Sequence, residues 1–488
     1  MKKEYIVLSI ILIFAIVLRI IFFTGINFND DVAYLNLAHN IVEGNFKPHP
    51  YIFATRLMMI YPIAFFFLFD ITEFTASLYI LLTSLGSVFL AYLIGKELFN
   101  KKTGLIAAFL LAVLPLEVVY ATTIVPDVPL AFFLALSVYL FIKAQKANNK
   151  WLFLFSGISI GLAWLVKTIA VIIILFFILN FIYDILIRKQ RPIAAIKPYL
   201  IVVLGLLSIF ILEGLIYASL GHSFLTSFIV NEEHYVPDLL GVNRNLKYYP
   251  NQLFNLDVIS KYFHYIGFYF YAALLSSILI LAARRKEAFI LLIWLFPIIL
   301  FMQYGSMSLS QYILIQRIYR FLTIISVPIV LLIAYPLANF KIKERIARPV
   351  IALILLFLAG TSFYYTYNAN IYLEKSIADT KLSAKFLAGL EEKPIYADET
   401  TIGYYNILFG YKKEHLLRKL DNVKDINEIH DAYVTVNTNR GYVELSNLKS
   451  RLPPAILNPP SDWQILYIVE ESDIEAYASY DAIIYYAP

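Results

Sequence analysis

The sequence has no cysteine among its 488 residues and few charged residues, at 15%. The lack of cysteine excludes disulfides, thiolate metal sites and thiol catalysis. Soluble domains carry about 25% charged residues, whereas this chain is 60% hydrophobic, with a mean hydropathy of +0.70. The composition excludes a soluble globular enzyme and a disordered chain, and it predicts that lipid is the solvent of most of the chain.

Two common motifs of soluble enzymes are also missing. The sequence has no glycine-rich phosphate loop and no H-E-x-x-H segment, so nucleotide hydrolysis and metalloprotease chemistry lack support. No nucleic acid is expected as a partner. The chain is instead rich in aromatic residues, with 37 tyrosines and 38 phenylalanines, which favour membrane interfaces.

Charge is divided unevenly along the chain. Residues 1–367 hold 28 Lys and Arg against 17 Asp and Glu, a net charge of +11, and residues 368–488 hold 12 against 18, a net charge of −6. Long apolar runs occur in the first part alone. We therefore predict a transmembrane domain over 1–367 and a small soluble α/β domain over 368–488, where short β-prone runs alternate with polar helical stretches and indicate a largely parallel sheet.

A helix needs about 20 apolar residues to cross the hydrocarbon core of a bilayer. Counting 52–69 as a span would move Lys96, Lys101 and Lys102 away from the other basic loops, so we predict that this apolar segment is interfacial. Eleven other runs predict transmembrane helices: residues 5–24, 74–95, 104–120, 124–142, 152–167, 169–187, 198–219, 263–282, 287–303, 319–339 and 349–367.

With eleven spans, all six loops on one side are basic, which places that side in the cytoplasm. The prediction is a multi-pass protein of the cell membrane with a cytoplasmic N-terminus and an extracytoplasmic C-terminal domain. Lys2 and Lys3 precede the first apolar run and no small-residue cleavage site follows it. The run is therefore expected to be a retained helix and not a signal peptide.

Acidic residues at the outer edge of the membrane are costly there and are candidates for function. Asp30 and Asp31 begin a helical pattern in which Asp31 and Tyr34 share a face. One of the two acids could be a helix N-cap, but a cap needs a single carboxylate. Asp127 follows a proline in the first turn of the predicted fourth span, where an acid also suits the helix dipole.

Basic residues lie at the same predicted outer edge. Lys167 separates the fifth and sixth spans, and Arg317 and Arg320 lie at the outer mouth of the tenth. Arginine suits bidentate binding of phosphate, although long cationic side chains also snorkel to lipid headgroups. Carboxylates that accept a proton, beside cations that hold a phosphate leaving group, indicate group transfer from a lipid phosphate.

A divalent metal at this outer acidic site is possible, although no cofactor is firmly expected. Glu232, Glu233 and His234 are adjacent in the loop 220–262, which favours a solvated loop over a metal site. His49 lies near the acidic pair but has no partners at the spacing of metal ligands.

Four segments in order resemble the GT-C membrane glycosyltransferases, in particular the branch with the protein O-mannosyltransferases and the bacterial lipid A aminoarabinose transferase. NDDVAYLNLA resembles the motif of the first outer loop in that branch, and PDVPLAFF resembles its second aspartate at the head of the fourth span. GLAWLVKT resembles a Gly-x-Ala-x-Leu-x-Lys segment, and RFLTIISVP an Arg-aromatic segment that ends in proline. The resemblance covers about residues 1–340.

The resemblance implies a GT-C fold with about 11 transmembrane helices plus interfacial helices, and a sugar donor linked to polyprenyl (dolichyl) phosphate. It also implies inversion at the anomeric carbon, with a protein, lipid or glycan as the acceptor. No WWD tripeptide is present, so the chain does not resemble the catalytic subunit of N-linked oligosaccharyl transfer. The roles implied are a general base for Asp30, support for the acceptor or the loop for Asp31, a second acid for Asp127, phosphate binding for Lys167, Arg320 and Arg317, and the substrate groove for Tyr34 and His49.

Two other classes of function stay open at this point. A transporter or flippase would use charges at mid-membrane, for which Glu213 and Asp184 are the candidates. A non-catalytic membrane subunit would use its acidic C-terminal domain to bind a partner. The sequence does not disclose the sugar, the acceptor or the oligomeric state.

Overall fold

A computed structural model describes most of the chain. The residues outside the description are 1–2, 28, 235–247, 255–265, 267, 307–311, 313, 316, 340–343, 376, 438–458 and 470–481.

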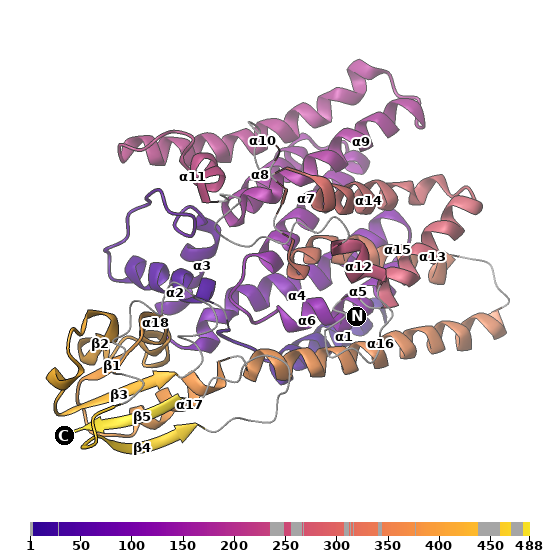
Figure 1. Ribbon diagram of the computed structural model, residues 1–488. Coiled ribbons are helices and arrows are strands. Elements are labelled where there is room, and N and C mark those ends of the chain that lie inside the picture. The colour runs from indigo at the N-terminus through magenta and orange to yellow at the C-terminus, as the bar shows by residue number, and fades with distance from the viewer. Residues whose placement is uncertain are drawn as a thin grey trace.

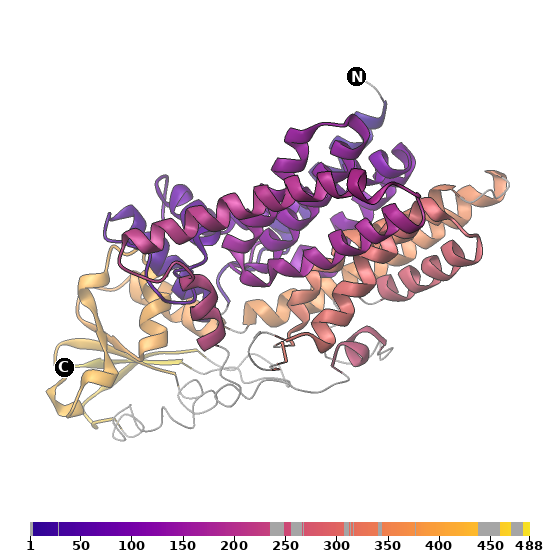
Figure 2. The ribbon, with the colours of Figure 1, turned by 90° about the horizontal axis from the view of Figure 1, so that it is seen from above.

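Helices form most of the described residues up to Lys375, and they run side by side away from a small C-terminal sheet (Figures 1 and 2). The N-terminus lies at the end of the helical part that is far from this sheet (Figure 2). The helices are α1 (Lys3–Ile21), α2 (Asn29–Val42), α3 (Leu57–Phe67), α4 (Glu73–Leu98), α5 (Lys101–Val113), α6 (Pro115–Val119), α7 (Asp127–Ala147), α8 (Lys150–Val166), α9 (Ile173–Leu186), α10 (Pro192–Ser219), α11 (Thr226–His234), α12 (Tyr248–Phe254), α13 (Phe268–Ala282), α14 (Phe289–Tyr304), α15 (Ser326–Asn339) and α16 (Glu344–Lys375).

Eight helices in the described residues are long and apolar enough to cross a membrane. They begin with α1 and end with Arg348–Leu373, and three shorter apolar helices are α3, α8 and α13. Each of the eleven predicted spans overlaps a helix within the described residues. The predicted span 104–120 is divided, because Pro115 ends α5 and begins α6. The segment 52–69 contains the short helix α3, whose 11 residues are too few for a regular crossing.

Small residues allow the closest helix contacts. A Cβ on Gly157 of α8 would lie 1.9 Å from the carbonyl oxygen of Val202 in α10, and a Cβ on Gly205 would lie 2.2 Å from that of Leu154. Close backbone approach at paired glycines is a usual way for membrane helices to associate.

Residues 157–161 have the pattern G-x-S-x-G, but they are continuous helix. The buried Ser159 hydroxyl donates a hydrogen bond to the carbonyl of Phe133.

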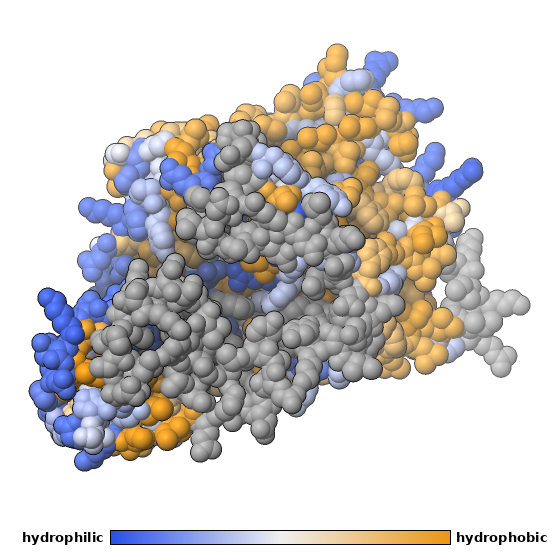
Figure 3. Space-filling model, viewed as in Figure 1, coloured by the Kyte–Doolittle hydropathy of each residue, from blue (hydrophilic) through white to orange (hydrophobic). Residues whose placement is uncertain are grey.

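Polar contacts join the ends of the helices on the predicted basic side. Lys101 Nζ lies 2.6 Å from Glu4 Oε2, and the Tyr335 hydroxyl donates to Glu287 Oε1 at 2.6 Å. Figure 3 shows hydrophobic residues over the helical part, with hydrophilic residues gathered at its two ends. The predicted cytoplasmic loops therefore lie together at one end.

A charged residue is enclosed between the first helices. Arg19 of α1 has no exposed surface. Its Nε donates to Ser84 Oγ of α4 at 2.9 Å, and its Nη1 donates to the carbonyls of Ala15 and Ala112 at 3.2 and 3.1 Å. These contacts give hydrogen-bond partners to the Nε and Nη1 groups of a guanidinium that would be costly in lipid.

In its described residues the C-terminal part is a five-stranded sheet with two helices against it, and it matches the predicted small α/β unit. The strand order is β2-β1-β3-β5-β4. The β1–β2 and β1–β3 pairs are parallel, whereas β5 pairs antiparallel with both β3 and β4. The sheet is thus mixed and not largely parallel as predicted. The elements are α17 (Ala378–Ala388), β1 (Ile395–Ala397), α18 (Glu399–Leu408), β2 (Leu417–Lys419), β3 (Ala432–Asn437), β4 (Gln464–Val469) and β5 (Ala482–Ala487).

Helix α18 belongs to both parts of the molecule. Ile402 and Tyr405 pack in the hydrophobic cluster of the sheet. Tyr404 and Ile407, each 1% exposed, pack in the large cluster of the membrane helices. The predicted boundary at residue 367 falls within α16, which carries the chain unbroken to Lys375.

Candidate functional site

The two acidic residues at the start of α2 point in different directions. Asp31 is fully buried, and its Oδ2 accepts a hydrogen bond from the backbone N–H of Asn27 at 2.8 Å. Asp30 is more exposed, with 36% of its side chain accessible, and its Oδ2 lies 3.0 Å from Arg320 Nη2. Asp31 therefore fixes the loop before α2, while Asp30 reaches a cation on a distant segment.

Asp127 and Lys167 meet at the junctions of neighbouring helices. Asp127 is the first residue of α7, and Lys167 is the extended residue between α8 and the 3-10 helix η1 (Thr168–Ile172). Asp127 Oδ1 lies 3.0 Å from Lys167 Nζ, with side-chain exposures of 1% and 7%. The same ammonium group lies 3.5 Å from the centre of the Phe321 ring, in a cation–π contact.

Arg320 links the two aspartates. It lies in the 3-10 helix η3 (Tyr319–Ile325), and its Nε is 3.3 Å from Asp127 Oδ2. Thr323 of the same segment donates its hydroxyl hydrogen to the backbone carbonyl of Asp127 at 3.2 Å, which holds η3 against α7. One continuous line of alternating charge is thus formed by Lys167, Asp127, Arg320 and Asp30, and we name it the charge cluster.

Sequence reasoning missed a third cation, Arg56. This arginine precedes α3, donates a hydrogen bond to the Tyr34 hydroxyl, and lies 5.4 Å from the centre of the Phe53 ring. Its charge acts on both Tyr34 and Lys167. A lone arginine inside the otherwise apolar segment 52–69 was the available signal.

Aromatic rings extend outward from this cation. Tyr34 packs edge-to-face on Phe53 at 5.1 Å, and Phe53 contacts Tyr51 at 5.3 Å. Partial burial and then the negative charge of Asp30 raise the pKa of Tyr51, which is 43% exposed. The exposed His49 ring lies parallel to that of Tyr51 at 6.1 Å. The predicted groove residues Tyr34 and His49 are therefore the inner and outer ends of one aromatic wall.

Arg317 differs in placement from the other predicted phosphate ligands. It is 3% exposed, and its Nη2 donates to the backbone carbonyl of Gln303 in α14 at 2.8 Å. The structure brings together Asp30, Asp127, Lys167 and Arg320 directly, with Tyr34 beside them through Arg56. Asp31 and Arg317 make their hydrogen bonds to backbone atoms of adjoining segments.

The donor set of the cluster does not suit a divalent cation. The carboxylates of Asp30 and Asp127 already form ion pairs with cations, and Arg320 pairs with both of them. Within the described residues there is no group of three His, Asp or Glu side chains that could hold a metal ion. Asp30 and Asp127, with Lys167, Arg320 and Arg56, amount to two negative and three positive groups, which suits an anion better.

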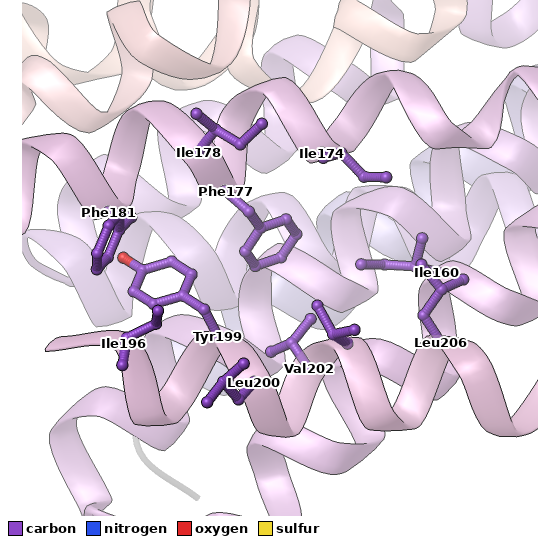
Figure 4. A pocket seen from close by; sticks show the side chains of 11 residues that line it. Ile160, Ile174, Phe177, Ile178, Phe181, Ile196, Tyr199, Leu200, Val202 and Leu206 are labelled. Atoms are coloured by element: carbon purple, nitrogen blue, oxygen red, sulfur yellow. The ribbon is translucent and has the colours of Figure 1, made fainter. Parts of the chain in front are cut away.

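An apolar cavity of about 290 Å³ opens between α8, α9 and α10 (Figure 4). Ile160 of α8 and Ile174 of α9 line it, and these residues lie seven positions before and after Lys167 in the sequence. Phe177 and Tyr199 also point into the cavity in Figure 4. Its wall is hydrocarbon, and it lies along the same helices that position the lysine.

Comparison with known sequences identifies one family over part of the chain. The family described as dolichyl-phosphate-mannose-protein mannosyltransferase matches residues 49–212, about a third of the chain. The match includes Arg56, Asp127 and Lys167, and it leaves Asp30 and Arg320 outside. An uncharacterised protein of Aquifex aeolicus (strain VF5) is 26% identical over 234 residues, which are 46% of this chain and 43% of that protein. The match thus spans less than half of the relative's length.

Solved structures match over more of the chain. The crystal structure of ArnT from Cupriavidus metallidurans bound to undecaprenyl phosphate matches with a TM-score of 0.63 at 12% identity, covering 99% of this chain and 98% of that one. The archaeal oligosaccharyltransferase AglB from Archaeoglobus fulgidus, in complex with an inhibitory peptide and a dolichol-phosphate, matches with a TM-score of 0.52 at 14% identity, covering 89% and 69%. This chain is therefore a multi-pass membrane protein with the GT-C fold, as the resemblance of its motifs predicted.

Proposed function

We propose that the protein is a membrane glycosyltransferase that moves a sugar from a polyprenyl-phosphate-linked donor to an acceptor hydroxyl. The observation that carries the proposal is the charge cluster, in which the accessible carboxylate of Asp30 lies at the end of a buried line of alternating charges. The match to the mannosyltransferase family over 49–212 and the likeness to ArnT bound to undecaprenyl phosphate support the donor class.

The cations would bind the donor phosphate. The inner part of the cluster is surrounded by Lys167, Arg320 and Arg56. The planar guanidinium groups of Arg56 and Arg320 can donate hydrogen bonds to the phosphate oxygens. Negative charge grows on the phosphate as the glycosidic bond breaks, so fixed cations stabilise the transition state more than the ground state.

Asp30 would be the general base. It is the more exposed of the two carboxylates in the cluster, and this exposure lets an acceptor approach it. In one displacement, the acceptor oxygen bonds to the anomeric carbon, the bond from that carbon to the phosphate oxygen breaks, and the hydroxyl proton passes to Asp30. The polyprenyl phosphate leaves with the bonding electron pair, and the configuration at the anomeric carbon is inverted.

Asp127 and Asp31 would act by positioning other groups. Asp127 is almost fully buried between Lys167 and Arg320, so it orients both cations toward the phosphate. Asp31 ties the loop before α2 through Asn27 and so fixes the start of the helix that presents Asp30.

The surroundings suggest where the rest of the substrates lie. The apolar cavity between α8, α9 and α10 begins about 10 Å along α8 from Lys167, by the helical rise over seven residues. It suits the first isoprenoid units of a donor. Tyr51 and His49, which are exposed, would line the groove for the sugar or the acceptor, which is a protein, lipid or glycan, with the buried Tyr34 behind them. The cluster would face the outside of the cell, with the basic end in the cytoplasm.

Transfer by purified protein tests this proposal. Protein in lipid nanodiscs is given polyprenyl-phosphate-mannose or polyprenyl-phosphate-glucose, and release of polyprenyl phosphate and the glycosylated acceptor is measured. Asp30→Asn should lower the rate at least ~100-fold, the smaller end of what general base catalysis contributes. Asp70→Asn, at an exposed aspartate between α3 and α4, is the matched control. Equal rates for Asp30→Asn and wild type would contradict the assignment of Asp30.

A further inference from the structure

The C-terminal unit, defined as residues 378–488, contacts α2 and the loop before it at three separate places. Helix α2 presents Asp30 and Tyr34 to the site. We propose that this unit is a clamp that sets the position of α2 for transfer, with Tyr411, Gly403 and Lys381 as its positioning residues. The proposal rests on the proposed function of Asp30.

Tyr411 makes the first contact, at the middle of α2. Its hydroxyl donates to Asn36 Oδ1 at 2.6 Å, and its ring stacks on that of His39 at 3.7 Å with an angle of 3° between the planes. Gly410 and Tyr411 follow the end of α18 with φ of 58° and 61°. A left-handed conformation is unfavourable for a bulky residue such as tyrosine, and such strain persists only where the surroundings enforce it. Here the ring is directed onto α2.

Gly403 makes the second contact, where α18 passes closest to α2. A Cβ at this position would lie 2.6 Å from Val32 Cγ1, whereas the Cβ and Cγ2 of Val32 would be 3.8 and 3.9 Å away. The absence of a side chain at Gly403 thus sets how near the two helices come. Val32 lies two residues after Asp30, so a displacement at Val32 moves the carboxylate.

Lys381 of α17 makes the third contact, at the loop that precedes α2. Its Nζ lies 2.7 Å from Glu73 Oε1 and 3.4 Å from the carbonyl of Thr24. The same Glu73 oxygen accepts the backbone N–H of Ile26 at 3.1 Å. The next residue, Asn27, donates its N–H to Asp31. The C-terminal unit therefore reaches the start of α2 through two further hydrogen bonds.

These contacts hold both the beginning and the middle of α2. Helix α2 otherwise packs on α3 and is joined to η3 by the pair between Asp30 and Arg320. Catalytic groups need placement to within about 0.5 Å, and a misplacement of 1 Å can cost about 100-fold in rate. A base that lies on a short helix outside the membrane spans needs such a support.

Gly403→Ala is the first test, with transfer kinetics in nanodiscs as the measurement. Alanine stabilises most helices relative to glycine, so a general loss of folding is not expected. The clamp predicts that kcat falls at least ~10-fold while the KM for the donor changes less than ~2-fold, because the phosphate-binding cations are untouched. The double variant Gly403→Ala/Val32→Ala removes the Cγ1 clash and should recover most of kcat. An unchanged kcat in Gly403→Ala, or no recovery in the double variant, would overturn the clamp.

The second test needs no activity. Hydrogen–deuterium exchange is followed at the amides of α2 in wild type, Tyr411→Ala and Lys381→Met, with Lys419→Met as the control for loss of an exposed ion pair in the same unit. Tyr411→Ala and Lys381→Met should speed exchange in α2 at least ~10-fold and leave α7 unchanged, whereas Lys419→Met should change neither helix. Equal α2 exchange in all four proteins would overturn the clamp. If wild type transfers no sugar but the α2 exchange responds, the clamp stands and the proposed function fails.

Discussion

Asp127 Oδ1 and Lys167 Nζ lie 3.0 Å apart, and both side chains are almost fully enclosed between α7, α8 and η3. Because both groups are buried, Lys167 is left as an uncompensated buried charge if Asp127 is lost, whereas Asp127 keeps Arg320 as a partner if Lys167 is lost. The pair therefore joins the stability of the fold to the chemistry of the site.

Removal of one member of this pair should destabilise the protein. Asp127→Asn leaves Lys167 charged and buried, which costs about 3–5 kcal/mol for a broken buried ion pair. Thermal unfolding in detergent should show a clear fall in Tm, together with loss of transfer. Asp127→Asn/Lys167→Met removes both charges and should recover part of the Tm but none of the transfer. A double variant no more stable than Asp127→Asn would contradict the coupling.

Arg56 should act on the donor. Arg56→Gln removes one cation beside the proposed phosphate position, and a hydrogen bond to a charged group contributes about 1.5–3 kcal/mol. The KM for the donor should therefore rise ~10-fold or more, with a smaller change in the KM for the acceptor. Arg56→Lys keeps the charge, and its KM for the donor should lie between the values for wild type and Arg56→Gln. Arg285→Gln, at the opposite end of the helices, is the control, and an equal effect of both glutamine variants would argue against phosphate binding by Arg56.

Chelation should leave transfer unaffected. The two carboxylates of the cluster are neutralised by Lys167 and Arg320, so no set of anionic ligands is left for a divalent ion. The measurement is the rate with EDTA, compared with the rate after Mg²⁺ or Mn²⁺ is restored in excess. A loss with EDTA that the metal reverses would show that the cluster rearranges to bind a cation.

The absence of cysteine allows a clean test of orientation. Gln190→Cys and Lys412→Cys place single thiols at exposed positions on the basic end and on the C-terminal unit. A membrane-impermeant maleimide should label Lys412→Cys on intact cells and Gln190→Cys after permeabilisation only. The reverse pattern would place the cluster in the cytoplasm and invert the proposed topology.

Much of the membrane part was predictable because the formation of its helices depends on short continuous stretches of sequence. Apolar runs of sufficient length predicted the helices, and the cost of charge near lipid singled out Asp30, Asp127, Lys167 and Arg320, which the structure brings together. Arg56 escaped this reasoning, since the segment 52–69 was tested as a candidate span and its own arginine was not considered.

The features that were not predictable depend on contacts far apart in the sequence. The local pattern did not separate the adjacent acids Asp30 and Asp31, and the family resemblance alone gave them different roles, because the direction of each side chain is set by η3 and by the loop at Asn27. The mixed sheet has the same cause: β5, the last strand, pairs between β3 and β4, and no local pattern shows that order. The three-residue strand β2 is too short to give a signal.

The enclosed guanidinium of Arg19 has a consequence for biogenesis. Its side-chain partner Ser84 follows 65 residues later in the chain, and the carbonyl of Ala112 follows 93 residues later. When α1 enters the bilayer during synthesis, neither exists, so Arg19 must stay at the level of the lipid headgroups. The helix can reach its final depth and rotation when α4 and α5 have been inserted, which makes its docking a late, post-insertion step of assembly.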